Sequence, residues 1–463
     1  MRGPRRFASR AVLALAIACC LRSTTAHAGN EDGVLLGNDA AIVGGAVTAD
    51  VHSGSALWYN PAGLMRVPTR TLDISARAYA MRFYRIPAFL TGPSGRSAEG
   101  NFNELVLIPS AASYVRPLGD KLRAGVGVFA PESFDYTVAS NLTIPSALSG
   151  AETRWQMVLA NTSASYHLVL GLAGAVSDRL DLGVTLHVIY ASSFINFQLG
   201  GGTVSTTPGV TNSVGLYAEA IQQSLKGVGI AIGTGLQWRP VDNVSLGVSI
   251  DSPTFLIVST RQLYTTEGAV LQDADMNGDV TFAPGFAVQD EHHTDFGLEM
   301  TVPARLRAGL ALQLGEHSLS AEIEVAHPLS NSKFSIHRRL LFNARAGWKM
   351  TLSPKLSIGA GLFTDRSPVR GQIAQFLDSK VDFYGGTVGL QYEKEHALAP
   401  GSRERTIGFG TTVGLRYAYG AGHIVGARVG DRFVVGENLD FQPNRTTLRI
   451  HEIALNLGGN VSF

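Results

Sequence analysis

The sequence contains only two cysteines, no excess of either charge and no long hydrophobic run. Cys19 and Cys20 both lie near the start, so a chain cleaved after Ala28 would have neither a disulfide nor a reactive thiol. Lys and Arg number 38 and Asp and Glu number 37, which gives no electrostatic reason to expect a nucleic-acid partner. No stretch reaches the roughly 18 consecutive apolar residues of a membrane helix. A membrane-spanning mature chain would therefore have to be a closed barrel.

Short catalytic motifs are absent as well. The sequence contains neither the nucleophile elbow G-x-S-x-G nor the zinc-binding motif H-E-x-x-H. We therefore expect no enzymatic activity. A barrel enzyme of the lipase or protease type is the alternative, because such an enzyme could use Ser and His residues that are scattered along the chain.

The first 28 residues have the pattern of an export signal. A positively charged start is followed by an apolar core, Ala11 to Leu21, and then by Ala26-His27-Ala28, which has the A-x-A form of a cleavage site. We expect residues 1–28 to be removed. Lipidation of Cys19 is the alternative, but the residues before it fit a lipidation site poorly.

Alternation of apolar and polar residues is the main pattern that is present. Near the end of the chain, Ile453 and Leu455 point to one side of an extended segment, and Glu452 and Asn456 point to the other. Glycine is abundant at 52 residues, and only 16% of residues are charged. This composition is typical of a barrel whose strands face lipid on one side and a polar interior on the other. The final Phe463 resembles the last residue of bacterial outer-membrane barrels.

About 14 segments have this strand pattern, and an even number is expected for a single-chain barrel. The expected strands are 71–84, 102–116, 121–130, 153–176, 180–199, 228–239, 243–259, 303–314, 317–329, 337–351, 355–365, 380–394, 405–420 and 446–463. Tight turns alternate with long connections near 85–101, 131–152, 200–227, 260–302 and 421–445. We predict an all-β fold, a transmembrane antiparallel β-barrel of about 14 strands in the outer membrane, with both chain ends on the periplasmic side. It should be a monomer in contact with outer-membrane lipid, because a closed barrel leaves no free edge.

The segment between the export signal and the first strand is rich in small residues and does not read as a strand. It contains Gly44-Gly45-Ala46 and then Trp58-Tyr59-Asn60-Pro61-Ala62-Gly63-Leu64. These motifs resemble the FadL family of outer-membrane transporters for long-chain fatty acids and aromatic hydrocarbons, as do Val302–Leu310 and Ser357–Arg370. The resemblance implies a signal peptide at 1–28, a hatch that plugs the barrel at 29–70 and a barrel at 71–463. The implied hatch-motif residues are Gly44, Gly45, Asn60, Pro61, Ala62 and Gly63.

The resemblance also implies a function, which is passive uptake of hydrophobic compounds such as long-chain fatty acids or hydrocarbons. Ligand would be captured by the outer loops after the fifth and seventh strands, and the hatch would then rearrange. Release would occur sideways through a kink in the third strand, for which Gly125, Gly127 and Pro131 are the candidates. An open porin or a structural barrel is the other alternative, but the plug-like N-terminus argues against an open pore.

Two groups of residues are candidates for ligand binding. Val214, Tyr217, Ile221 and Leu225 recur at helical spacing, which predicts a helix in the connection 200–227. This helix would either bind ligand or only cap the barrel mouth.

Among the cations expected inside the barrel, Arg305 and Arg345 are candidates for holding a carboxylate. Arg307 is expected to pair with Glu324 across the tight turn at Gly315.

One acidic connection resembles a calcium-binding loop. Asp273, Asp275, Asn277 and Asp279 have the spacing of calcium ligands, but Pro284 stands where the twelfth-position Glu is expected. A solvated acidic loop is the alternative interpretation. The sequence predicts no other cofactor.

Overall fold

The structure is a computed structural model of the whole chain. It describes residues 34–145, 151–205, 214–274, 280–282, 285–334, 336–373, 379–397, 406–429 and 442–463. The expected export signal lies outside the described residues. Among the described residues, no helix has the length and apolar character needed to cross a membrane.

Nearly all of the strands belong to one antiparallel sheet that closes on itself, because β1 pairs with β19 along most of its length. The strands are β1 (Thr71–Thr91), β2 (Ser97–Pro117), β3 (Leu122–Pro145), β4 (Ala151–Ser177), β5 (Leu180–Ser205), β6 (Val214–Val241), β7 (Val244–Asp251), β8 (Thr254–Ala274), β9 (Val280–Phe282), β10 (Gly285–Val302), β11 (Arg305–Leu314), β12 (His317–Ala326), β15 (Leu341–Ser353), β16 (Leu356–Asp365), β17 (Ser379–Ala397), β18 (Thr406–Arg428) and β19 (Gln442–Ser462). Since β7 continues into β8 and β10 into β11, the barrel has 14 strand positions, as predicted.

The remaining elements are short. A separate hairpin consists of β13 (Leu329–Asn331) and β14 (Ile336–Arg338). Two short helices, α2 (Asn38–Ile42) and α3 (Ala56–Tyr59), and a 3-10 turn, η1 (Pro61–Arg66), precede β1, and another, η2 (Pro93–Gly95), follows it. Residues 34–70 form what we call the N-terminal segment, which lies inside the barrel.

The barrel has its apolar face outside. On β5, Leu182, Val184 and Leu186 are 43, 45 and 41% exposed, whereas Asp181 and Thr185 between them are each 2% exposed. A soluble sandwich would show the opposite arrangement. The outward apolar band therefore suits lipid, and the inward polar face suits an enclosed interior.

The strands are longer than the sequence pattern predicts, and the predicted helix is wrong. Val214, Tyr217, Ile221 and Leu225 all belong to β6, which pairs with β5 at Phe197↔Ile221 and nearby positions. Local helical spacing is a weak signal for apolar residues in a short window. Here it is overridden by the continuous backbone pairing that the long neighbouring strand offers.

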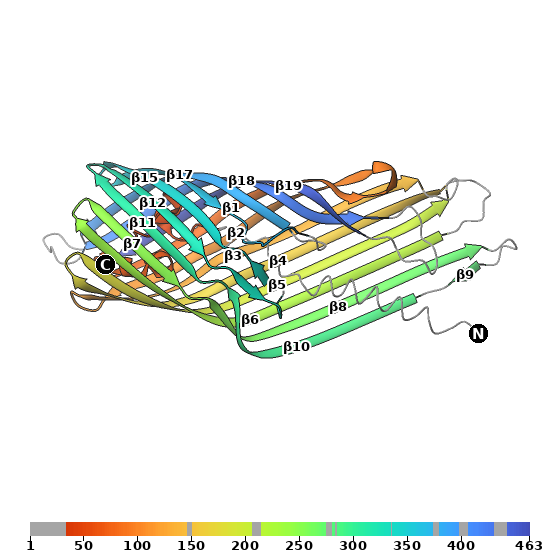
Figure 1. The fold of residues 1–463 in the computed structure, drawn as a ribbon. Coiled ribbons are helices and arrows are strands. Elements are labelled where there is room, and N and C mark those ends of the chain that lie inside the picture. The colour runs from red at the N-terminus through yellow and green to blue at the C-terminus, as the bar shows by residue number, and fades with distance from the viewer. Residues whose placement is uncertain are drawn as a thin grey trace.

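The two walls of the barrel differ in height. On one side β4, β5 and β6 have 27, 26 and 28 residues, whereas β11, β12 and β16 on the other have 10 each. About 9–11 residues suffice to cross a bilayer. We call β3–β6, β8 and β10 the tall wall and β11, β12, β15 and β16 the low wall. Figure 1 shows β6, β8 and β10 running far beyond the end of the low wall.

The height of the wall changes at the level where two neighbouring strands are both interrupted. The predicted strand 243–259 is interrupted at Ser252-Pro253, between β7 and β8, and the neighbouring strand is interrupted at Pro303-Ala304, between β10 and β11. Proline cannot donate a backbone hydrogen bond to a sheet, so both ladders end there. Beyond the break, β8 pairs with β6 and β10 instead of β11.

Candidate functional site

The N-terminal segment is the floor of the site, and the barrel wall has space for it because many inward-facing wall residues are glycines. A Cβ added at Gly183, Gly247 or Gly361 would overlap backbone atoms of Pro61, Thr48 or Val43, respectively. Other wall glycines that face the segment are Gly125, Gly171, Gly235, Gly309, Gly359, Gly389, Gly414 and Gly458. The segment is thus enclosed by strands from β3 round to β19.

The motif residues hold the segment's shape. Gly44 and Gly45 have φ angles of 66° and 81°, which only glycine adopts readily. The Asn60 side chain accepts a hydrogen bond from Ala62 N at 3.2 Å and donates to the carbonyl oxygens of Thr48 at 2.8 Å and Leu236 of β6 at 3.0 Å. Asn60 therefore fixes the corner and ties it to the wall.

Pro61 and Gly63 complete the same corner. Pro61 begins η1, where its missing N–H costs no hydrogen bond. A Cβ at Gly63 would overlap Val51 of the same segment. Ala62 is fully buried. All of the motif residues pack within the floor or against the wall.

Buried charges of the low wall also hold the segment. Glu322 accepts hydrogen bonds from the backbone N–H groups of Val47 at 3.2 Å and Thr48 at 3.0 Å, and from Arg345 Nη1 at 2.6 Å. Arg345 is thus engaged with Glu322, and it does not line the cavity described below. A cross-strand carboxylate in the interior therefore serves two roles, as an ion-pair partner and as an acceptor for the floor.

The expected pair of Arg307 and Glu324 is confirmed. The two residues are directly opposite on β11 and β12, and Arg307 Nε donates to Glu324 Oε2 at 2.9 Å. Arg307 Nη1 also donates to Asp251 Oδ2 at 3.0 Å. Arg305, the other candidate, lies 3.6 Å from the same Asp251 carboxylate, and its guanidinium lies 6.0 Å from the ring centre of Trp58.

Charged groups within the floor pair with one another. Asp39 Oδ1 lies 3.7 Å from His52 Nε2. The negative charge of Asp39 raises the pKa of His52. Burial alone would raise the pKa of Asp39, but the nearby His52 and Lys349 outweigh it, and the pKa of Asp39 is lowered. Arg66 pairs with Asp50, and burial lowers the pKa of this guanidinium.

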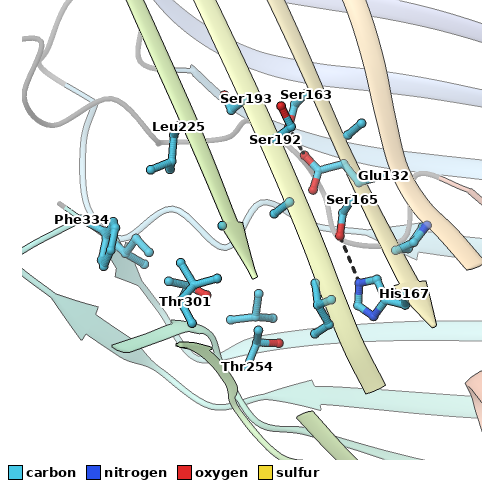
Figure 2. A pocket seen from close by; sticks show the side chains of 18 of the residues that line it. Glu132, Ser163, Ser165, His167, Ser192, Ser193, Leu225, Thr254, Thr301 and Phe334 are labelled. Atoms are coloured by element: carbon cyan, nitrogen blue, oxygen red, sulfur yellow. Dashed lines mark hydrogen bonds between the residues drawn. The ribbon is translucent and has the colours of Figure 1, made fainter. Parts of the chain in front are cut away.

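A cavity of about 160 Å³ lies above the floor. Trp58 of the N-terminal segment lies at its base, and Ile189, Leu225, Leu256 and Val302 give it apolar walls. Figure 2 shows Leu225, Thr254 and Phe334 on one side of the cavity and Glu132 and His167 on the other. Such a mostly apolar cavity with a few polar groups is typical of a binding site for a small hydrophobic molecule.

One serine–histidine contact lies in the cavity wall. Ser165 Oγ lies 3.0 Å from His167 Nε2, as Figure 2 shows. The other ring nitrogen, His167 Nδ1, is buried and has no hydrogen-bond partner among the described residues. A catalytic histidine is normally oriented by an acid at that position. The described part of the chain therefore does not give this pair the geometry of a triad.

The structure brings together only some of the predicted ligand residues. Arg305, Leu225 and Pro131 line the cavity. Ile221 is buried in an apolar cluster farther along the barrel, and Val214 and Tyr217 lie still farther along β6. The sequence pattern did not single out His167 or Phe334, because their place in the site depends on which strands meet across the interior.

The third strand has an irregularity near Pro131. Pairing of β3 with β4 shifts register between Phe129 and Glu132. Pairing with β2 is recorded at Asn101↔Ala139 and resumes only at Ala111↔Phe129, so the ladder between them is interrupted. We call this interruption the β2–β3 gap. Its edge at Pro131 lines the cavity.

The two candidate glycines of β3 lie in a regular part of the strand. Gly125 is paired with Val115 and Gly171, and Gly127 with Ser113 and Val169. A Cβ at Gly125 would crowd Leu57 of the floor, and one at Gly127 would overlap Phe129. Their close packing explains glycine at both positions without a kink.

Most of the suggested calcium loop lies outside the described residues. Asp275, Asn277 and Asp279 lie outside the described residues, and Asp273 belongs to β8, where its backbone pairs with Thr281 of β9. In the described ranges, no group of three or more metal-binding side chains is present.

Comparisons with known proteins agree with this geometry. The sequence profile described as "Outer membrane protein transport protein (OMPP1/FadL/TodX)" matches residues 25–327, which is more than half of the chain. A search of curated proteins finds no match.

Solved structures show the same fold. A FadL homologue of Pseudomonas aeruginosa is 14% identical with a TM-score of 0.55, and the alignment covers 92% of this chain and 98% of that one. The toluene transporter TodX of Pseudomonas putida is 15% identical with a TM-score of 0.50, over 93% and 99% of the two chains. This chain therefore belongs to the OMPP1/FadL/TodX family of outer-membrane transport proteins.

Proposed function

We propose that this protein is a passive transporter that takes small hydrophobic molecules across the outer membrane. The observation that carries the proposal is the apolar cavity, which lies directly on the N-terminal segment at Trp58 and extends to the wall irregularity at Pro131. A protein cavity that replaces water with apolar contacts favours the passage of apolar molecules.

The N-terminal segment acts as the hatch in this proposal. It closes the barrel below the cavity, and its contacts with Glu322 and Asn60 hold it there. A molecule that reaches the cavity therefore meets a closed floor. Rearrangement of the residues around Trp58 would open a path from the cavity toward the wall.

Release occurs sideways through the β2–β3 gap. The described β2–β3 ladder has no residue pair between Asn101↔Ala139 and Ala111↔Phe129, and Pro131 has no N–H with which to extend it. A hydrophobic molecule leaving at this point enters lipid and avoids water. The outer strand tips, where the sequence predicts capture, include residues outside the described ranges.

The ligand class is a hydrocarbon or a long-chain fatty acid, and Arg305 offers a way to distinguish them. Its guanidinium reaches the cavity beside Trp58 while also lying near Asp251. A carboxylate could form a charge-assisted hydrogen bond with it, whereas a neutral hydrocarbon could not. Arg305→Met should therefore reduce uptake of fatty acids and leave uptake of toluene unchanged if acids are the natural ligands.

Uptake by cells that lack their own such transporter tests the proposal. Radiolabelled toluene, hexadecane and oleate would be supplied to cells with and without this protein. We expect faster uptake of at least one compound, and Ala191→Trp, which fills the cavity, should abolish the gain. Val188→Trp is the matched control, because Val188 is on the outward face of the same strand. No gain with any compound, with the protein folded in the outer membrane, would sink the proposal.

A further inference from the structure

In the described residues, the tall wall ends at β10, which pairs with another strand along one edge. β10 pairs with β8 from Gly285 to Val302, and its other edge has no strand partner in the part of the chain that the structure describes. The low-wall strands β11 and β12 pair with each other and end at the level of the Pro303 break. The wall is therefore discontinuous above the low wall, on the side of β10 that faces away from β8.

The hairpin β13–β14 covers this discontinuity. Asn331 Nδ2 donates to the backbone oxygen of Met300 at 2.9 Å. Lys333 Nζ lies 3.3 Å from Glu299 Oε1 and 3.5 Å from Asp295 Oδ1. These side chains are between 34 and 43% exposed. Exposed ion pairs of this kind contribute little free energy, so the contact between hairpin and β10 is easily broken.

The same hairpin forms part of the cavity wall. Phe334 and Ile336 of the hairpin region line the cavity together with Thr301 and Val302 of β10. Figure 2 shows Phe334 on the opposite side of the cavity from Glu132, which lies next to Pro131. The cavity thus reaches both wall irregularities, the β2–β3 gap on one side and the hairpin on the other.

Both ends of the barrel interior are filled around the cavity. The N-terminal segment lies below it. On the far side, inward apolar residues of the tall wall and of β1 pack into a cluster in which Phe89, Met157 and Ile144 are at most 1% exposed. Such burial shows that these side chains pack against one another.

The outside of the hairpin edge is apolar. Phe296 and Leu298 on β10 are 80 and 70% exposed, next to the strand edge that the hairpin covers. Large exposed apolar side chains at this position would stabilise a hydrophobic molecule against the wall before it entered.

We propose that the β13–β14 hairpin is a gate, and that hydrophobic molecules exchange through it between the outer face of the membrane and the cavity. The hairpin opens when Lys333 and Asn331 separate from β10. This passage is distinct from the β2–β3 gap, which lies on the opposite side of the cavity. The proposal rests on the proposed function, because it uses the same cavity as the binding site.

A kinetic experiment tests the gate. In the double variant Glu299→Cys and Lys333→Cys, a short bismaleimide would bridge hairpin and strand. Binding of the neutral fluorophore N-phenyl-1-naphthylamine to the full mature chain in liposomes would be followed by stopped flow. A gate predicts that bridging slows association and dissociation to the same extent, down to the rate that the β2–β3 gap alone sustains, and leaves Kd unchanged, because only the barrier changes. Unchanged rates would overturn the gate, whereas absence of any binding to the unbridged protein would overturn the proposed function.

A second readout does not depend on the ligand. Ser193 lines the cavity, so Ser193→Cys provides a thiol there, and the mature chain is expected to contain no other. Adding Lys333→Glu would repel Asp295 and Glu299, and labelling of that thiol by N-ethylmaleimide should become several-fold faster. Lys355→Glu, at an exposed turn remote from the hairpin, is the matched control. Equal labelling rates in the two variants would contradict the gate.

Discussion

The inner faces of the low wall and the tall wall have opposite chemistry. The low wall presents buried charges, Arg307, Glu322, Glu324 and Arg345, whereas the tall wall presents apolar residues such as Met157 and Phe197 beyond the cavity. Glu322 of the low wall accepts hydrogen bonds from the backbone of the N-terminal segment, and a fixed geometry results. The apolar side chains of the tall wall impose no direction on a partner. One wall thus positions the floor, and the other carries a packed apolar cluster beyond the cavity.

Removing the N-terminal segment should have the largest effect, because it is the floor that the low wall holds in place. We predict that deletion of residues 29–63 converts the closed barrel into a conducting pore, because the low wall would then face water in place of the segment. Single-channel recording in planar bilayers measures the conductance. A deleted barrel that folds and stays closed would show that something other than the segment blocks the interior.

The second-largest effect should come from breaking a buried ion pair of the low wall. Glu322→Leu removes the acceptor for Val47, Thr48 and Arg345, and the buried Arg345 loses its main partner. Breaking a buried ion pair in this way costs about 3–5 kcal/mol. Urea unfolding of the protein in liposomes should show this loss. Glu316→Leu, at an exposed turn, is the control and should change stability by less than about 0.5 kcal/mol.

Substitution of a wall glycine tests the packing of the wall against the N-terminal segment. Gly247→Val places a side chain where the backbone oxygen of Thr48 lies, so the floor must shift, at a cost of about 1–3 kcal/mol. We expect a lower unfolding midpoint together with brief channel openings. Gly297→Val on β10 has nothing within 4 Å of its Cβ and should be neutral. Equal effects of the two substitutions would mean that the loss of stability comes from strand propensity and not from contact with the floor.

The smallest effect should come from pH. The pKa of Asp39 is lowered, so its contribution to stability is present above the ordinary carboxyl pKa and is lost as the pH falls through the folded value. The pKa of His52 is raised, so its contribution is complete below the ordinary histidine pKa and is lost as the pH rises through the folded value. The pair is therefore most favourable in mildly acidic solution.

His52→Gln should remove the loss on the alkaline side of this profile, as measured by thermal unfolding across the pH range. The effect is small because the His52 side chain is 44% exposed. His292→Gln, on the exposed part of β10, serves as the control. A profile that is unchanged in the His52 variant would show that the pair does not contribute.

Much of the fold could be predicted from the sequence, because period-two alternation and tight turns are local signals. The turn at Gly315 places Arg307 opposite Glu324, so that pair could be read from spacing alone. The contact of Arg345 with Glu322 could not be predicted in this way. The hairpin β13–β14 lies between β12 and β15 in the sequence, so the register of these two strands does not follow from the spacing of their residues.

Most of the cavity could not be predicted from the sequence, because its lining residues come from strands that are far apart along the chain. Trp58 belongs to a recognisable motif and Leu225 was a candidate, but His167 and Phe334 come from elements that meet only across the closed barrel. The helix predicted around Ile221 failed because four apolar residues at helical spacing can also lie in a strand when a long partner strand is available.

The pairing of β1 with β19 has a consequence for how the chain is assembled. The N-terminal segment is the first part of the described chain, and it contacts the last two strands, through Asn38 near Gly458 and Ala41 near Gly414. Once β19 has zipped against β1, the strands surround the segment on every side. The contacts of the segment with β18 and β19 are therefore complete only when the ladder that closes the barrel is also in place, so the seam of the barrel and the position of its floor are fixed together.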